Sequence, residues 1–417
     1  MKITGIIVEY NPFHNGHLYH LQKTKQLTKA DYIVAVMSGN FVQRGEPACI
    51  NKWTRTKMAL QAGVDLVLEL PVIYATASAE TFAWGAIQIL QQTGIVNSLC
   101  FGSEDGNLNT LKKIAEILYK EPFLFKRELK KNLDQGLNFP KARSNAIQYY
   151  IKMTGIKTQS CINDILSSPN NILGIEYLKA LLKLNSTIIP YTFSRIANSY
   201  HSTYTKGPIS SATAIREKIL KNHFSILKQT MPSFAYQLIK EEIENKKAPI
   251  IYDTFSSILQ YILRTLSATD LRSFMEISEG LENRIMTTGS KYFTISEIIE
   301  NMATKRYTQT RICRELLHII LQIKTSDILK YKQQGGPQYI RILGFRKESQ
   351  QALSLLKSHC SLPIISNTKK FMQQANPLQK KMLKQEILAT DIYTLGYPNS
   401  SYRIKGYDYT IPIIIQE

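Results

Sequence analysis

The sequence has no long apolar run and few cysteines. None of its 417 residues lies in a stretch of about 18 consecutive apolar residues, so no membrane-spanning helix and no membrane partner are expected. The apolar stretch before Glu9 is too short for a signal peptide, which favours a cytoplasmic protein. The five cysteines are widely spaced and form no Cys-x-x-Cys pair, which argues against a disulfide scaffold and a zinc site. We therefore expect no metal ligands from the chain itself.

Acidic residues are also scarce. The chain carries 52 Lys and Arg against 32 Asp and Glu, a net charge of +20. The excess is uneven, because residues 1–100 hold eight basic and six acidic residues, whereas residues 301–417 hold eighteen and seven. A basic region beside a near-neutral one is typical of an enzyme core joined to a polyanion-binding module, which favours nucleic-acid binding. A general contribution to solubility is the alternative interpretation.

The first half of the chain alternates between strand and helix signals. Apolar, β-branched runs predict strands at Ile3–Val8, Tyr32–Met37, Asp65–Leu70, Ser98–Phe101 and Thr187–Phe193. Helical spacing predicts helices at about His17–Leu27, Trp53–Ala62, Ala79–Gln91 and Asn171–Leu184. This alternation predicts a Rossmann-like α/β fold with a parallel, doubly wound sheet, in which ligands bind beyond the carboxyl ends of the strands.

The most informative segment follows the first strand directly and reads EYNPFHNGH, residues 9–17. Gly16 permits close backbone approach, and the N-terminus of the following helix presents N–H groups that bind phosphate. Two imidazoles at this point, His14 and His17, can donate hydrogen bonds as charge develops on an α-phosphate and a leaving pyrophosphate. Histidines that only cap a turn are the structural alternative.

A second segment, ISSATAIR at residues 209–216, places hydroxyl groups at a helix start and an arginine within two turns. Ser211 and Arg216 could together hold a phosphate, although an ordinary capped helix has the same pattern. With the first segment, it resembles the HxGH and ISSTxIR signatures of the nucleotidyltransferase superfamily, with Ala212 before Thr213 as a mild departure. The resemblance implies ATP binding and in-line attack on the α-phosphate, without a covalent enzyme intermediate.

Further segments narrow the resemblance. They are MSGNFVQRGEPA (37–48), NKWTRTKMAL (51–60), LELP (68–71), FGSE (101–104), SPNNILGIEYLKAL (168–181), KRYTQTRICRELLHIIL (305–321) and RILGF (341–345). With them, the chain resembles the bacterial tRNA(Met) cytidine acetate ligase family over essentially its full length. The resemblance implies that ATP and acetate form acetyl-adenylate and pyrophosphate. The acetyl group then passes to N4 of the wobble cytidine, position 34, of elongator tRNA(Met), forming N4-acetylcytidine.

The resemblance also assigns nucleotide contacts. The implied ATP loop consists of Ile7, Val8, Glu9, Tyr10, Asn11, Pro12, Phe13, His14, Asn15, Gly16, His17, Leu18, Tyr19 and His20, with His14 and His17 catalytic. Gly102 would let adenosine approach the backbone, either Asn170 or Asn171 matches the next contact, and Arg195 with Ile196 matches the last. A turn glycine, a helix cap and a surface charge are the alternatives. ATP is expected to bind as its magnesium complex.

Lys52 and Arg55 rank second, together with Ser211 and Arg216. Lys52 and Arg55 open a predicted helix beside the expected site, where a cation could hold the carboxylate of acetate or a phosphate. Arg55 as a solvated helix residue is equally consistent with the sequence.

The candidate tRNA-binding side chains are Lys305, Arg306, Arg311 and Arg314. Arg311 and Arg314 are three residues apart, so on a helix they share a face that could follow a phosphate backbone. Arg341, Arg346 and Lys347 are expected to extend this surface. A solvated basic helix face is the alternative.

The expected organisation has three parts. Residues 1–220 form the nucleotidyltransferase-like catalytic domain, residues 221–330 a helical domain, and residues 331–417 a small, basic, mixed α/β region that binds tRNA with the preceding helices. Two other functions remain open. The chain could be a small-molecule adenylyl- or cytidylyltransferase acting on a cofactor precursor, which would leave the basic C-terminal region unexplained. It could also be a non-catalytic, nucleotide-regulated RNA-binding protein.

Overall fold

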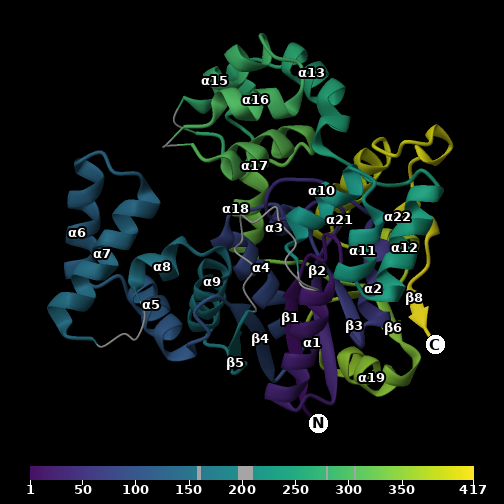
Figure 1. Ribbon diagram of the computed structural model, residues 1–417, viewed down its shortest axis with the longest axis horizontal. Coiled ribbons are helices and arrows are strands. Elements are labelled where there is room, and N and C mark those ends of the chain that lie inside the picture. Colours follow the sequence, from purple (N-terminus) through teal and green to yellow (C-terminus); the bar gives the residue numbers. More distant parts are fainter. Residues whose placement is uncertain (157–160, 196–209, 279, 305–306) are drawn as a thin grey trace.

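The structure, a computed structural model, describes residues 1–156, 161–195, 210–278, 280–304 and 307–417 (Figure 1). At its centre is one sheet with the strands β1 (Ile3–Val8), β2 (Tyr32–Ser38), β3 (Leu66–Leu70), β4 (Ser98–Ser103), β5 (Ile189–Ser194), β6 (Ile340–Arg346), β7 (Ile364–Ile365) and β8 (Ile414–Gln416). The five strands expected in the first half of the chain are all present, each within two residues of the expected bounds.

The sheet is parallel at its centre and switches direction of winding at β1. The strand order is β5-β4-β1-β2-β3-β6-β7, and β8 pairs with β6. The pairs β1–β2, β1–β4, β2–β3 and β4–β5 are parallel, whereas β6 joins β3 antiparallel. The chain crosses from one side of β1 to the other between β3 and β4, so the doubly wound α/β class is confirmed.

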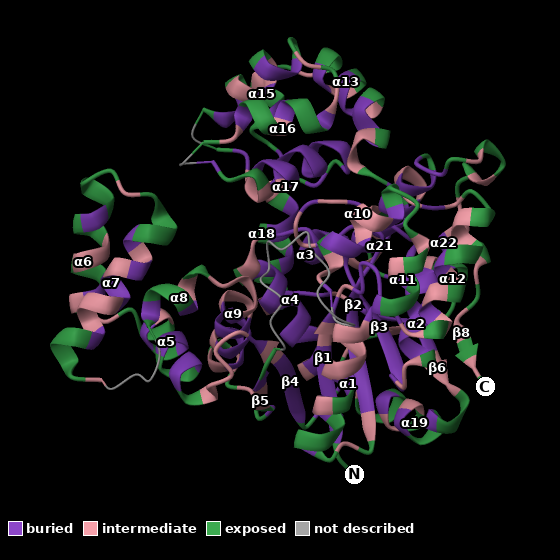
Figure 2. Cartoon of the chain, viewed as in Figure 1, coloured by how far each residue is buried: buried purple, intermediate pink, exposed green. Residues whose placement is uncertain are grey.

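The central strands are apolar on both faces because helices cover both sides of the sheet (Figure 2). The residues of β2 from Ile33 to Met37 are all fully buried. Val34 and Val36 belong to one hydrophobic cluster, and Ile33, Ala35 and Met37 belong to another. A strand buried on both faces has a continuous apolar run rather than an alternating one, which is the pattern that its sequence shows.

Helices fill the connections between the strands. Between β1 and β5 they are α1 (Asn15–Thr28), α2 (Lys52–Gln61), α3 (Val72–Ala75), α4 (Ala79–Gln92), α5 (Leu108–Lys120), α6 (Phe123–Asp134), α7 (Phe139–Thr154), α8 (Ile162–Ser167) and α9 (Pro169–Lys183). Between β5 and β6 they are α10 (Ala212–Leu220), α11 (Phe224–Thr230), α12 (Ser233–Glu244), η1 (Tyr252–Phe255), α13 (Ser256–Thr265), α14 (Ala268–Leu271), α15 (Leu281–Gly289), α16 (Ile295–Met302), α17 (Gln309–Ile320) and α18 (Thr325–Gln333). The described part of residues 221–330 therefore has the expected helical character.

The C-terminal region returns to the central sheet. After β6 it contains η2 (Lys347–Ser349), α19 (Gln350–His359), α20 (Thr368–Gln374), α21 (Pro377–Thr394), η3 (Ser400–Tyr402) and α22 (Tyr407–Thr410). Residues Leu66 to Glu69 of β3 pair with residues Phe345 to Arg341 of β6, so this region extends the sheet of the N-terminal half. The division expected at residues 220 and 330 stays a prediction.

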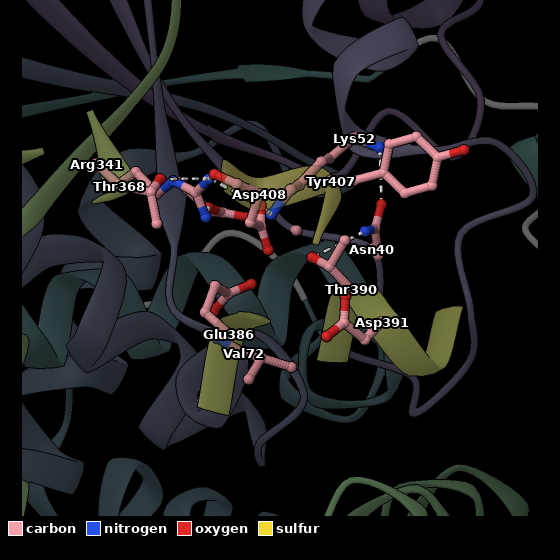
Figure 3. Close-up of polar contacts among 12 residues, drawn as sticks. Asn40, Lys52, Val72, Arg341, Thr368, Glu386, Thr390, Asp391, Tyr407 and Asp408 are labelled. Atoms are coloured by element: carbon pink, nitrogen blue, oxygen red, sulfur yellow. Dashed lines mark hydrogen bonds and ion pairs between the residues drawn. The ribbon is translucent and has the colours of Figure 1, made fainter. Parts of the chain in front are cut away.

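Four buried charged side chains join these distant segments in what we call the buried ion-pair ring, formed by Lys52, Glu69, Arg341 and Asp408 (Figure 3). Lys52 Nζ lies 2.7 Å from Glu69 Oε1 and 2.8 Å from Asp408 Oδ1. Arg341 Nη1 lies 3.0 Å from Glu69 Oε2, and Nη2 lies 2.7 Å from Asp408 Oδ1. All four residues are at most 5% exposed. The expectation that Arg341 extends an RNA-binding surface is therefore wrong, because its charge is neutralised in the interior.

A fifth buried group, Glu386 of α21, lies beside the ring. Its Oε2 accepts a hydrogen bond from the backbone N–H of Val72 at 2.6 Å. Burial, reinforced by the neighbouring Glu69, raises the pKa of Glu386 well above its ordinary value. The ring itself contains two cations and two anions, so its four members have no net charge.

We predict that Asp408→Asn lowers the free energy of unfolding by about 3–5 kcal/mol, because Lys52 and Arg341 then share only one buried anion. Urea unfolding followed by circular dichroism measures this loss. Lys120→Ala is the control, since it breaks a solvent-exposed pair with Glu116 and should cost less than about 1 kcal/mol. Equal losses in the two variants would contradict the prediction.

Candidate active site

The segment after β1 forms a loop at the carboxyl edge of the sheet and leads into α1. His14 is the N-cap of α1, and its Nδ1 accepts a hydrogen bond from the backbone N–H of Gly16 at 3.0 Å. His17, three residues later, accepts the backbone N–H of His14 at its own Nδ1, at 3.3 Å. This reciprocal arrangement is a capping box, in which two histidines take the places usually held by Ser or Thr and Glu. It brings the two predicted catalytic residues together.

The two caps determine which nitrogen of each ring can act on a ligand. Because Nδ1 accepts a hydrogen bond in both rings, the proton of each neutral imidazole is on Nε2. The ring centroids of His14 and His17 are 3.8 Å apart. Burial, with Arg195 and Arg216 nearby, lowers the pKa of His14 to about 3. Burial and His14 also lower the pKa of His17, so both rings are neutral Nε2–H donors at neutral pH.

Buried aromatic rings fix the loop around these histidines. Tyr10 and Phe13 are fully buried with ring centroids 4.7 Å apart, and the Tyr10 ring meets His17 edge-on at 5.0 Å. His20, one turn further along α1, lies with Nε2 3.3 Å from the carbonyl oxygen of Cys100 in β4. The other members of the predicted ATP loop lie in the last turn of β1, in the loop or in the first turns of α1: Ile7, Val8, Glu9, Asn11, Pro12, Asn15, Gly16, Leu18 and Tyr19.

Arg55 of α2 ties the ends of two strands together from the interior. Its guanidinium is fully buried and donates to the carbonyl oxygens of Glu9 at 2.6 Å and Ser38 at 3.0 Å, and also to that of Gly39. Lys52 is equally buried in the ion-pair ring. The expected role of these two cations in holding acetate or phosphate stays a prediction, and these contacts do not favour it.

The second predicted segment lies against the loop. Ser211 caps α10 by accepting the backbone N–H of Ala214 at 3.1 Å. Arg216 Nη1 donates to the carbonyl oxygen of Asn11 at 3.0 Å, and Nη2 lies 3.5 Å from Glu46 Oε2. Arg216 is therefore placed beside the histidine loop, whereas Ser211 serves first as a helix cap.

Glu104, which follows β4, orients the two candidate asparagines. One of its carboxylate oxygens accepts the side-chain amide of Asn170 at 2.7 Å, and the other accepts the backbone N–H of Asn171 at 2.8 Å. Asn171 Oδ1 in turn accepts the N–H of Asp105 at 3.1 Å, and Asn171 is only 2% exposed, whereas Asn170 is partly exposed. The role of Glu104 in orienting the asparagines was not predicted from the sequence. The only sequence feature that could have indicated it is an acidic residue directly after the Gly-Ser pair of β4.

Gly102 leaves room for the side chain that follows β5. A Cβ atom at this position would lie 2.9 Å from Cγ of Arg195 and 3.2 Å from Cζ of Phe193. The backbone N–H of Arg195 donates to the carbonyl oxygen of Ser103 at 2.9 Å, which places Arg195 beside the end of β4. Ile196, the other predicted contact here, lies outside the described residues.

The predicted tRNA-binding arginines of α17 are engaged with carboxylates. Arg311 Nε lies 2.8 Å from Glu315 Oε1, and Arg314 Nε lies 2.8 Å from Glu276 Oε2. Their contact with RNA stays a prediction. Two further candidates lie outside the described residues, Lys305 and Arg306.

The described residues contain neither a cluster of metal-ligating side chains nor a membrane-spanning helix. No group of three or more His, Cys, Asp or Glu side chains converges there in a way that could hold a metal ion. None of the helices in the same part of the chain combines the length and the apolar character needed to cross a membrane.

Comparisons with known proteins cover the whole chain. Residues 1–408 match the family described as HIGH Nucleotidyl Transferase. The tRNA(Met) cytidine acetate ligase of Acetivibrio thermocellus is 45% identical over 421 residues, covering 100% of both chains, and that of Thermoanaerobacter sp. X514 is 46% identical, covering 99% of this chain and 100% of the relative. Among solved structures, Thermotoga maritima TmcAL bound with alpha-thio ATP superposes with a TM-score of 0.93 at 34% identity, and its apo form with 0.94 at 35%; each comparison covers 100% of both chains.

The low pKa of His14 predicts a stability that falls in acid. Its folded pKa of about 3 lies below the unfolded value near 6.5, so the unfolded chain binds the proton more tightly. The contribution is complete above pH 6.5 and is lost as the pH falls. Between pH 7 and pH 5 we expect His14 alone to remove about 2 kcal/mol of stability. The His14→Asn variant keeps an N-cap acceptor, and its free energy of unfolding should fall by about 2 kcal/mol less between these pH values than that of the unmodified protein. Urea titrations at pH 7 and pH 5 measure this difference. An unchanged pH dependence would contradict the prediction.

Proposed function

The chain belongs to the tRNA(Met) cytidine acetate ligase family of HIGH nucleotidyl transferases, and from this premise we propose how its residues carry out the reaction. The protein is an ATP-dependent ligase that activates acetate as acetyl-adenylate and acetylates N4 of cytidine 34 of elongator tRNA(Met). The observation that carries the mechanism is the pair of Nε2–H donors presented by His14 and His17 at the start of α1.

In the first step, a carboxylate oxygen of acetate attacks the α-phosphorus of ATP. A new P–O bond forms, the bond from the α-phosphorus to the bridging oxygen breaks, and pyrophosphate leaves with the electron pair. His14 and His17 donate their Nε2 protons as hydrogen bonds to the phosphate oxygens, and the N-terminus of α1 adds its N–H groups. Because these donors are held by backbone hydrogen bonds, little reorganisation is needed as charge develops.

In the second step, the exocyclic N4 of cytidine attacks the acyl carbon of acetyl-adenylate. A C–N bond forms, the C–O bond to AMP breaks, and N4 loses one proton. The cytidine amine is a poor nucleophile, so prior activation of acetate as acetyl-adenylate lowers the barrier to the attack of N4 on the acyl carbon.

Magnesium is proposed to enter with ATP. Phosphate oxygens and water would supply most of its ligands, as is usual for magnesium bound with a nucleotide. Bound in this way, the ion neutralises charge on the phosphates. Arg216, beside the loop, is proposed to add a further positive charge near the leaving pyrophosphate.

The adenosine end of ATP is proposed to lie over β4 and the start of α9. Gly102 supplies a backbone without a Cβ atom, and Asn170 is the more exposed residue of the asparagine pair. Asn171 is proposed to act indirectly, because its amide oxygen already accepts the N–H of Asp105 in a buried position.

We predict that His17→Ala lowers cytidine acetylation about 10²–10³-fold, because one preorganised donor to the phosphates is removed. The assay combines protein, ATP, magnesium, labelled acetate and total tRNA, and follows label in RNA and release of AMP. His359→Ala, which changes an exposed histidine at the end of α19, should retain full activity.

Each outcome of this assay has a distinct meaning. Label in one tRNA that disappears with His17→Ala supports both the ligase and the role of the loop. AMP formed from ATP and acetate without label in RNA would remove the tRNA step. Pyrophosphate released only with another acid or a phosphorylated precursor would favour the small-molecule transferase instead.

Alanine substitutions of the two asparagines are predicted to affect different properties, the KM for ATP in one case and the stability in the other. Asn170→Ala should raise the KM for ATP about 3- to 10-fold with little change in stability, because it removes one hydrogen bond to the ligand. Asn171→Ala should lower the free energy of unfolding by about 1–2 kcal/mol, since the N–H of Asp105 loses this acceptor. Steady-state kinetics and urea unfolding of both variants measure the difference. The reverse pattern would assign the contact to Asn171.

A further inference from the structure

The helices α6 and α7 form an antiparallel pair that projects from the body of the protein, which we call the helical arm, residues 123–154 (Figure 1). A loop of four residues joins the two helices, and the outer surface of the arm is largely exposed (Figure 2). In α6 only Phe125 and Asn132 are buried. The arm therefore offers most of one helix to solvent.

The exposed surface of the arm is strongly basic. It contains seven Lys and Arg residues against Glu128 and Asp134, a net charge of +5 over 32 residues. Lys130, Lys141 and Lys152 form no ion pair with any residue that the structure describes. The pair between Lys131 and Glu128, at 3.8 Å, is at the surface, where such pairs contribute little.

The arm also exposes aromatic rings beside these cations. Phe123 is 76% exposed and Phe139 is 55% exposed. The guanidinium of Arg143 lies 5.8 Å from the ring centroid of Phe139. In α6, Phe123, Arg127 and Lys130 are spaced by four and three residues, so they share one exposed face of the helix. Proteins that bind single-stranded RNA commonly combine exposed aromatic rings with cations, because bases stack on the rings and phosphates bind the cations.

The arm is joined to the helix that starts at the proposed nucleotide site. Arg143 of α7 forms an ion pair with Glu176 of α9, with Nη1 and Oε1 3.3 Å apart, and Glu176 is only 3% exposed. Asn170 and Asn171 lie in the first turn of α9, about 8–9 Å along the helix axis from Glu176. A ligand held on the arm is thereby kept at a defined distance from the proposed nucleotide site.

We propose that the helical arm binds the tRNA substrate, with Lys130, Lys131 and Arg127 on phosphates and Phe123 stacked on an unpaired base. This inference rests on the proposed function and adds the surface that receives the RNA. Lys130 has no ion pair among the described residues and Lys131 lies as far as 3.8 Å from Glu128, whereas Arg311 and Arg314 of α17 lie 2.8 Å from their carboxylates. An acidic protein partner would match the charge but would leave the exposed rings without planar partners.

The test uses the full-length Lys130→Glu/Lys131→Glu variant. Its tRNA affinity should fall about 10- to 100-fold, and the slope of log affinity against log salt should decrease by about 1–2, because phosphate contacts are lost. Formation of acetyl-adenylate, measured by acetate-dependent pyrophosphate exchange into ATP, should be unchanged. Phe123→Ala should lower affinity about tenfold with an unchanged salt slope, because it removes stacking only.

The matched control is Lys2→Glu/Lys25→Glu, which reverses two exposed lysines directly before β1 and near the end of α1, outside every region expected to bind tRNA. It has the same change in net charge and should retain tRNA affinity. If both double variants lose affinity equally, or if the arm variant binds as the unmodified protein does, the proposal is overturned. Loss of pyrophosphate exchange in the unmodified protein would instead count against the proposed function, so the two failures can be distinguished.

Discussion

The buried ion-pair ring is the constraint on which the rest of the fold depends. It joins α2, β3, β6 and α22 through two cations and two anions that have almost no access to water. A buried ion is costly unless each charge is matched, so the four segments can pack only when all are present. Beside the ring, burial and the neighbouring Glu69 raise the pKa of Glu386, which favours the uncharged form of its carboxyl group. Arg55, in the same helix as Lys52, then ties the carboxyl ends of β1 and β2, where the histidine loop begins.

The site itself depends on backbone hydrogen bonds more than on charge. The imidazoles of His14 and His17, the proposed catalytic residues, are both oriented by main-chain N–H groups and kept neutral by burial. A neutral donor can bind an anionic phosphate without the desolvation cost of a buried cation. Similarly, Glu104 holds the two asparagines through both of its oxygens. The site therefore presents hydrogen-bond donors whose orientation is fixed before a ligand binds, and the charge is expected on the phosphates of the ligand.

Local patterns predicted the strands, the histidine loop and the helix caps because each depends on residues close in sequence. The partners of charged side chains could not be predicted in this way. Lys52 and Arg341 had the same sequence signal as surface cations, and their carboxylates lie far along the chain in Glu69 and Asp408. In the same way, the exposure of Phe123 beside the cations of α6 depends on how α6 and α7 pack. Burial and long-range pairing are thus the information that only the three-dimensional structure supplies.

The antiparallel strand β6 has a consequence for the order in which the protein can form during translation. The strands that carry the histidine loop leave the ribosome first, but the edge of β3 stays uncovered until residues 340–346 follow. Asp408, which pairs with Lys52 and Arg341, completes the ion-pair ring only after a further stretch of chain has been synthesised. Contacts of such sequence separation form slowly, and an uncovered strand edge invites pairing with other chains. The nascent N-terminal half therefore keeps one strand edge unpaired for most of its synthesis time.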